Sequence, residues 1–233
     1  MTVFLYYFIA GLLIFLHLMC ENISIFCKYN YAGLSKQMQG AVVGNYFAVT
    51  SRVFISLYAV FIAYLIEANS LQANFYAFSL AISILVACLF SFFLSKIRLT
   101  HKLTYSRFGS FHKIIFYKPD ELHSIPSVSF IIMIFVGVQF IASSFAYILC
   151  LNFPANRLFI ISLAPVASMV GTLISITLVE PKYARCIDQK HETSFGISSA
   201  YLLGRCLSFL VCTTLFLVFV VLYWEYKNSF DEI

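Results

Sequence analysis

The sequence predicts an all-α, polytopic membrane protein with six transmembrane helices, and three observations carry this prediction. Of the 233 residues, 61% are hydrophobic and only 11% are charged, whereas a soluble domain carries about 25% charged residues. The mean hydropathy is +0.90. Apolar runs longer than about 18 residues, the length that crosses a bilayer, recur along the chain. We therefore expect a single membrane domain over residues 1–233, and its net charge of +5 does not indicate nucleic-acid binding.

The six spans follow from these apolar runs. The first has no basic residue before it and no small-residue cleavage site after it, so we expect it to be retained and not removed as a signal peptide. A basic loop at residues 95–126 is the only sizeable segment that we expect outside the membrane. The predicted spans cover residues 3–19, 41–66, 74–94, 127–151, 158–178 and 198–224.

Lysine and arginine are distributed unequally between the two sides of such a bundle. Eleven lie in the first, third and fifth loops, and two lie in the fourth loop and the C-terminal tail. The other two, Arg52 and Arg205, lie inside spans. Because cytoplasmic loops carry the excess of positive charge, we expect both termini outside the cell and the basic loop inside it. This sidedness also supports an even number of spans.

The basic loop has a pattern of its own. Apolar residues from Leu99 to Ile115 recur near helical spacing, with lysine and histidine between them. This pattern is typical of a helix lying on an anionic membrane surface, so we predict that residues 95–126 contact anionic lipids. A basic anchor that only fixes the topology is the alternative. Pro119 and Pro126 would interrupt any single long helix.

Two arginines at membrane depth are the strongest candidates for function. An arginine at the centre of a span costs roughly 2.5–3.5 kcal/mol on insertion scales, so such residues usually face a protein interior or a wet cavity. Arg52 and Arg205 lie at matching depth in the cytoplasmic half of their spans. Two cations facing one interior would repel each other unless an anion or Glu21 joined them. Guanidinium groups bind phosphate oxygens in a bidentate manner, which makes a pyrophosphate the expected ligand; snorkelling to the surface is the alternative.

Other polar residues share helix faces with one another. Asn45 and Arg52 are seven residues apart, or two helical turns, and His17 and Glu21 are four residues apart. Serine and threonine residues in the spans are more simply explained by helix packing. The predicted substrate-binding set is Arg52, Arg205, Asn45, His17, Glu21, Asn22 and Gln139.

Catalytic and cofactor-binding motifs are absent from the sequence. It contains no Gly-rich phosphate loop, no HExxH and no GxSxG, and no cluster of carboxylates of the kind that holds Mg²⁺. The seven cysteines form no CxxC pair, which is typical of packing residues and not of metal or disulfide sites. We therefore expect transport without a cofactor and not catalysis, with an acid–base pair of His17 and Glu21 as the minor alternative. The six spans also divide into two three-span halves of inverted topology, as in many alternating-access transporters.

Three segments resemble the Amj-type lipid II flippases, a bacterial family that is the alternate to the MurJ flippase. They are "HLMCENISIFCKYNYAGLSKQMQGAVVGNYFAVTSRVF" at residues 17–54, "LVEPKYARCIDQ" at 178–189 and "LLGRCLSFL" at 202–210. The positions that carry the resemblance are His17, Asn22, Ser24, Lys28, Ala32, Gly33, Ser51, Arg52, Glu180, Pro181, Lys182, Gly204 and Arg205.

The resemblance implies a protein of cell-wall synthesis in the bacterial cytoplasmic membrane. Such a flippase moves lipid II, a disaccharide-pentapeptide on undecaprenyl pyrophosphate, from the inner to the outer leaflet. The pyrophosphate would then pair with Arg52 and Arg205, and one half of the protein would rock against the other. Two alternatives stay open: a transporter of another anionic lipid or lipid-linked glycan, and a non-transporting scaffold subunit. The energy source and the oligomeric state are not encoded in any motif.

Overall fold

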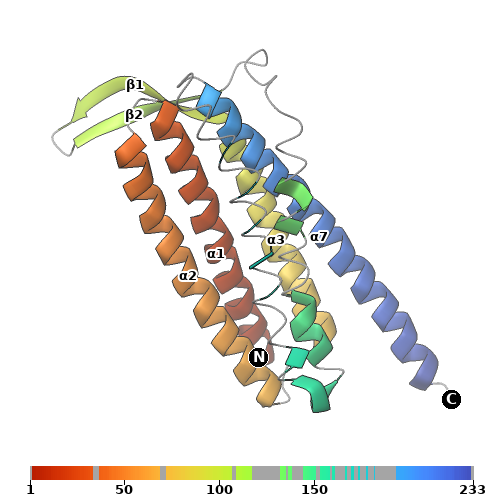
Figure 1. Ribbon diagram of the computed structural model, residues 1–233. Helices are drawn as coiled ribbons and strands as arrows, with labels where there is room; N and C mark the ends of the chain where they lie inside the picture. Colours follow the sequence, from red (N-terminus) through yellow and green to blue (C-terminus); the bar gives the residue numbers. More distant parts are fainter. Residues whose placement is uncertain are drawn as a thin grey trace.

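Four long helices form the body of the protein, as the computed structural model in Figure 1 shows. They are α1 (Thr2–Gly33), α2 (Gln37–Glu67), α3 (Ala73–Ser95) and α7 (Thr193–Asp231). A short 3-10 helix, η2 (Pro154–Asn156), lies between α3 and α7 in the sequence. The structure describes residues 2–33, 37–68, 72–106, 109–116, 132–134, 136–137, 144–150, 153–157, 159–160, 166, 169–170, 173, 177, 181 and 193–231.

The polytopic membrane class is confirmed by these helices. Each contains a segment long and apolar enough to cross a bilayer, and these segments agree with the first, second, third and sixth predicted spans. The predicted spans at 127–151 and 158–178 lie largely outside the described residues. The four segments are Phe4–Tyr31, Met38–Glu67, Ala73–Ser95 and Ser198–Leu222.

The first helix is much longer than predicted. The predicted span stopped at Met19, because polar residues follow it, whereas α1 continues to Gly33. No proline interrupts this extension, and two of its polar side chains, Asn22 and Asn30, are fully buried. Asn30 Nδ2 donates to Phe26 O at 3.0 Å and to Ser198 Oγ of α7 at 3.2 Å. As a result, residues 17–21 lie in the middle of a membrane-spanning segment and not at its end.

The basic loop forms a β-hairpin and not the predicted surface helix. Strand β1 (Ile97–Ser106) pairs antiparallel with β2 (Gly109–Phe116), with Ile97 opposite Phe116 and an irregular register between Thr100 and Leu103. Threonine, isoleucine, tyrosine and phenylalanine are frequent in this segment, and such β-branched and aromatic residues favour strands. The prediction of an all-α fold therefore holds only for the membrane-spanning part of the described chain. Contact with anionic lipids stays a prediction.

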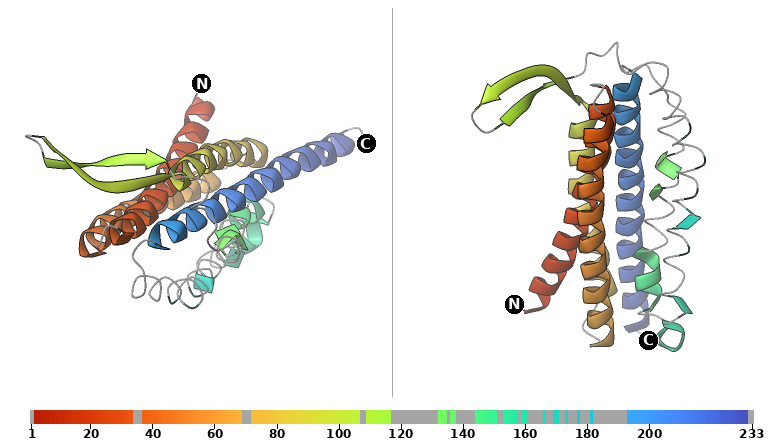
Figure 2. Two further views of the ribbon diagram at one scale, coloured as in Figure 1. Left: turned by 90° about the horizontal axis from the view of Figure 1, so that it is seen from above. Right: turned by 60° about the vertical axis from the view of Figure 1, so that its left-hand side comes forward.

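The hairpin marks one end of the bundle. Figure 1 and the right-hand view of Figure 2 show it extending from the end where α1 and α3 finish and α7 begins. We call this the hairpin end, and we call the end that holds Glu67 and Ala73 the opposite end. Helix α1 contacts α2, α3 and α7, while α3 packs along α7. The fully buried side chains at the centre include Leu18, Ile62 and Phe209.

The outer surface of the helices is apolar. Large hydrophobic side chains are exposed on all four of them, such as Phe4, Val60, Leu89 and Val221. Contiguous exposed apolar surface of this kind marks contact with a membrane or a partner. The buried and exposed faces of each helix are therefore both hydrophobic, and polar side chains stand out wherever they are enclosed.

Candidate functional site between the spans

A half-buried ion pair joins α1 to α7. Arg205 Nη2 donates to Glu21 Oε2 at 2.6 Å, and the side chain of Arg205 is 6% exposed while that of Glu21 is 36% exposed. The guanidinium carbon also lies 5.3 Å from the centre of the Phe209 ring. Arg205 Nε is buried and has no hydrogen-bond partner among the described residues. The arginine thus contacts one carboxylate and one aromatic ring, and its guanidinium group has further N–H groups that can donate hydrogen bonds.

The ion pair lies within the membrane-spanning part of the bundle. Contacts between α3 and α7 fix its level: Ser91 Oγ donates to Leu202 O at 2.8 Å, and Cys88 Sγ lies 3.2 Å from Cys206 Sγ. Arg205 is therefore level with the part of α3 near Cys88, two turns or about 10 Å before Ser95. Moving a charged side chain from water to this depth costs free energy, so such residues occur mainly where they are paired and functional.

His17 connects this ion pair to α2. Its Nε2 lies 3.8 Å from Glu21 Oε1, which is longer than a hydrogen bond. Its Nδ1 lies 2.7 Å from Ser51 Oγ and 3.1 Å from Ser51 O. Ser51 is 1% exposed. Polar groups of three helices thus lie in a row from Ser51 of α2, past His17 and Glu21 of α1, to Arg205 of α7, with a gap between His17 and Glu21.

Two glycines bring α2 close enough to α1 for this contact. A Cβ on Gly40 would lie 2.6 Å from Tyr31 Cβ, and one on Gly44 would lie 3.0 Å from Ser24 O. In return, Ser24 Oγ donates to Gly44 O at 2.7 Å. A Gly-x-x-x-Gly pattern is a common contact between membrane helices. The letters "GAVVG" at 40–44 are therefore a signal in the sequence that predicts the α1–α2 contact, and our sequence analysis missed it.

Arg52 is not buried with Arg205, which corrects the expectation that both guanidinium groups face one interior. The side chain of Arg52 is exposed, and so is that of Asn45, which shares its helix face. The reason is rotation about α2, because Ser51 occupies the side that meets α1 and the next residue points about 100° away. Arg52 still acts electrostatically on Glu21, as do His17 and Arg205.

The other predicted residues divide into three cases. His17, Glu21 and Arg205 come together as described, although Ser51 was not in the predicted set. Asn22 is completely buried, and neither its Oδ1 nor its Nδ2 has a hydrogen-bond partner among the described residues. Such an amide is costly unless water or a ligand satisfies it. Gln139 lies outside the described residues.

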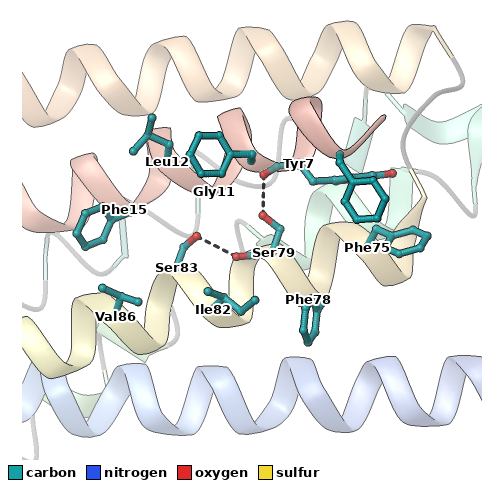
Figure 3. Close-up of a pocket in the computed structure, with 12 residues that line it drawn as sticks. Tyr7, Gly11, Leu12, Phe15, Phe75, Phe78, Ser79, Ile82, Ser83 and Val86 are labelled. Atoms are coloured by element: carbon teal, nitrogen blue, oxygen red, sulfur yellow. Dashed lines mark hydrogen bonds between the residues drawn. The ribbon is translucent and has the colours of Figure 1, made fainter. Parts of the chain in front are cut away.

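A groove of different character lies between α1 and α3, nearer the opposite end. It encloses about 370 Å³, and aromatic and aliphatic side chains form most of its wall (Figure 3). Its two serines already donate, Ser79 Oγ to Tyr7 O at 2.8 Å and Ser83 Oγ to Ser79 O at 2.9 Å. The groove suits hydrocarbon and offers nothing to an anion, so the candidate site for a charged ligand is the cluster around Glu21 and Arg205.

Comparisons with known proteins do not extend this description. No family model matches the sequence, and neither a curated protein nor a solved structure matches it. Within the part of the chain that the structure describes, no group of three or more His, Cys, Asp or Glu side chains is placed to hold a metal ion. The functional argument therefore rests on the geometry of the cluster and on the sequence resemblance given above.

Proposed function

We propose that this protein is a membrane transporter of a lipid-linked anion, and that the lipid is lipid II, as the resemblance implies. The observation that carries the proposal is the ion pair between Glu21 and Arg205, which joins two spanning helices at membrane depth. Ionisable residues in membrane spans are rare, and they usually mark the path of a substrate or an ion.

In the proposed mechanism, Arg205 exchanges one anion for another. Its guanidinium group has five N–H donors in a planar fork that matches phosphate oxygens, and its Nε has no hydrogen-bond partner in the part of the chain that the structure describes. A pyrophosphate that replaces Glu21 keeps the arginine paired throughout, so no isolated cation is left in the membrane. The exchange also removes the ionic link between α1 and α7, which frees these helices to move apart.

Arg52 supplies a second cation from the lipid-facing side in this mechanism. Its side chain is exposed on α2, and it is close enough to the cluster for its charge to act on Glu21. A lipid headgroup approaching from the bilayer would meet Arg52 before Arg205. The prenyl chain would stay in the bilayer, and the buried amide of Asn22 would offer hydrogen bonds to the polar headgroup.

A second candidate function is that of a non-transporting scaffold subunit. The exposure of Arg52 and Asn45 on one face of α2 favours it, because a polar face in lipid is satisfied when a helix of a partner protein covers it. In that case the Glu21–Arg205 pair would serve only to join α1 to α7. A transporter of another anionic lipid would use the same cluster and would differ in substrate alone.

Headgroup exposure in a bacterium depleted of its own lipid II flippases tests the proposal. We expect the wild-type protein to restore external exposure of lipid II, and Arg205→Gln to lose most of this activity per molecule of protein in the membrane. Arg205→Lys should keep part of it, because the charge survives while the bidentate fork is lost. Arg157→Lys, a change of the same chemistry away from the cluster, is the matched control.

Two results would point elsewhere. Normal exposure of lipid II with Arg205→Gln would contradict the role of the arginine. Failure of the wild-type protein to expose lipid II, together with flipping of other anionic lipids by purified protein in liposomes, would assign a different substrate. No flipping in either assay, with a partner protein recovered through the Arg52 face, would favour the scaffold.

A further inference from the structure

The ring of His17 is oriented by two oxygen atoms of one residue. Its Nδ1 lies 3.1 Å from the carbonyl oxygen of Ser51 and 2.7 Å from the hydroxyl oxygen of the same residue. A carbonyl oxygen can only accept a hydrogen bond. If Nδ1 were bare, its lone pair would face the lone pairs of the carbonyl oxygen. The ring proton of neutral His17 therefore belongs on Nδ1, where both oxygens can accept it.

This assignment leaves the other ring nitrogen bare. In the neutral imidazole one nitrogen donates and the other accepts, so Nε2 turns a lone pair toward Glu21 Oε1, 3.8 Å away. Both atoms are acceptors, and no proton lies between them. The distance between Nε2 and Oε1 is too long for a hydrogen bond. Such a separation is expected for two acceptor atoms that have no proton between them. One added proton would convert this contact into a charge-assisted hydrogen bond.

We propose that Nε2 of His17 and Oε1 of Glu21 form a proton-binding site, and that its occupancy controls the ion pair between Glu21 and Arg205. A proton that enters from water adds to the Nε2 lone pair, and no covalent bond breaks. The imidazolium then donates to Oε1, so Glu21 is shared between two cations. Its attraction for Arg205 weakens, and the new positive charge repels the guanidinium group.

Charges of both signs lie around this site. Among the described elements packed on α1, α7 contributes Arg205 and α2 contributes Arg52, both positive. Helix α3 contains no acidic or basic residue from Ala73 to Ser95, and Cys20 of α1 adjoins Glu21. Glu21 is thus the carboxylate that makes protonation of His17 favourable, and the arginines oppose it.

The proton site links proton binding at His17 to binding of an anionic headgroup at Arg205. This consequence rests on the proposed function, because it requires that an anion compete for Arg205. Protonation of His17 weakens the hold of Glu21 on Arg205, so the proton and an anionic headgroup would bind together more readily than either alone. By linkage, each ligand raises the affinity for the other by the same factor. A proton gradient could then drive the movement of the headgroup.

Nitrogen-15 NMR of the full-length protein in lipid nanodiscs, with labelled histidine, tests the proton site without any lipid substrate. The chain has five histidines, and loss of one signal in His17→Gln assigns His17. At alkaline pH we expect its proton on Nδ1 and a bare Nε2, and on acidification we expect Nε2 to gain a proton. In Glu21→Gln the ratio of charged to neutral His17 at a fixed pH should fall about tenfold or more.

Two further variants should change the ratio of charged to neutral His17 in the opposite direction. Arg205→Gln should raise the ratio of charged to neutral His17, and Arg52→Gln, on the exposed face of α2, should raise it less. A neutral His17 with its proton on Nε2 would overturn the proposal, and so would a ratio that Glu21→Gln leaves unchanged. Because this measurement needs no substrate, it can succeed when lipid II exposure fails, and the two failures are therefore distinguishable.

Discussion

The two ends of α1 meet their neighbours in different ways. Toward the hairpin end, His17, Glu21 and Asn30 make polar contacts with α2 and α7. Toward the opposite end, Tyr7 and Gly11 line an apolar groove against α3 (Figure 3). Helix α1 therefore contacts its neighbours through charged and polar side chains along one part of its length and through uncharged packing along the other. Only the charged part can respond to a proton or an anion, which is why we place function there.

A second pair of buried polar groups sharpens this contrast. The hydroxyl groups of Tyr58 on α2 and Tyr76 on α3 hydrogen-bond to each other, and these residues are 3% and 1% exposed. This pair joins two helices near the opposite end without any charge. If burial of polar groups serves only to join helices, both pairs should behave alike; if the charged pair serves a ligand, they should differ in both stability and activity.

Loss of one partner of the charged pair should have the largest effect. Arg205→Gln leaves Glu21 without its partner. Because the Glu21 side chain is 36% exposed, the cost should lie between the roughly 1 kcal/mol of an exposed pair and the roughly 3–5 kcal/mol of a fully buried one. Unfolding of the purified protein in mixed detergent micelles measures the free energy. Arg157→Gln, which removes a hydrogen bond from Nε to Cys150 O at 3.2 Å and no ion pair among the described residues, is the control. A loss below about 1 kcal/mol, the value for an exposed pair, would contradict the enclosure of this pair.

Overpacking at the α1–α2 contact should come next. Gly40→Ala places a methyl group 2.6 Å from Tyr31 Cβ and 3.0 Å from the carbonyl oxygen of Lys28, and such overpacking costs about 1–3 kcal/mol. The same unfolding measurement applies. In the matched variant Gly11→Ala, the methyl group meets the hydroxyls of Ser79 and Ser83 at 2.8 Å. Because hydroxyls can turn aside more easily than backbone, its cost should be smaller, and the reverse order would refute this packing.

Loss of one partner of the uncharged pair should have a moderate effect. Tyr76→Phe removes one hydroxyl and leaves that of Tyr58 without this partner, at a cost of about 1 kcal/mol. The double variant with Tyr58→Phe should cost less than the sum of the two single variants. Transport activity per molecule should be unchanged. Strict additivity of the free energies would show that the two hydroxyls do not depend on each other.

The smallest effect on stability is expected at Arg52. Because its side chain is exposed, Arg52→Gln should change the free energy of unfolding by no more than about 0.5 kcal/mol. Its effect on lipid II exposure should be much larger, since the proposed headgroup meets this cation first. Glu67→Gln, another exposed charge on α2, provides the comparison. A stability loss as large as that of Arg205→Gln would mean that Arg52 is enclosed after all.

The sequence was sufficient for part of this account. Hydropathy located four spans, and helical periodicity placed His17 and Glu21 on one face; the need of Arg205 for an anion was also recognised, with Glu21 as one candidate. Hydropathy could not find the end of α1, because buried polar residues such as Asn30 lower the apolar average without breaking the helix. It could not give the rotation of α2, which the contacts of Gly40 and Gly44 determine.

The prediction of a surface helix in place of the hairpin was wrong for a different reason. Its apolar residues fit helical spacing, but its β-branched and aromatic composition favours strands, and in the structure the strand preference prevails. Apart from the hairpin, the structure differs from the prediction in features set by contacts between segments: which face of α2 meets α1, how far α1 extends, and what partners the polar residues find.

The double variant Glu21→Gln with Arg205→Gln tests the central claim most directly, namely that this pair serves a ligand and does not only join two helices. With both charges removed, no unpaired ion is left inside, so the stability lost in Arg205→Gln should largely return. We predict a stable protein that fails to expose lipid II in flippase-depleted cells. A double variant that is both stable and fully active would contradict the claim.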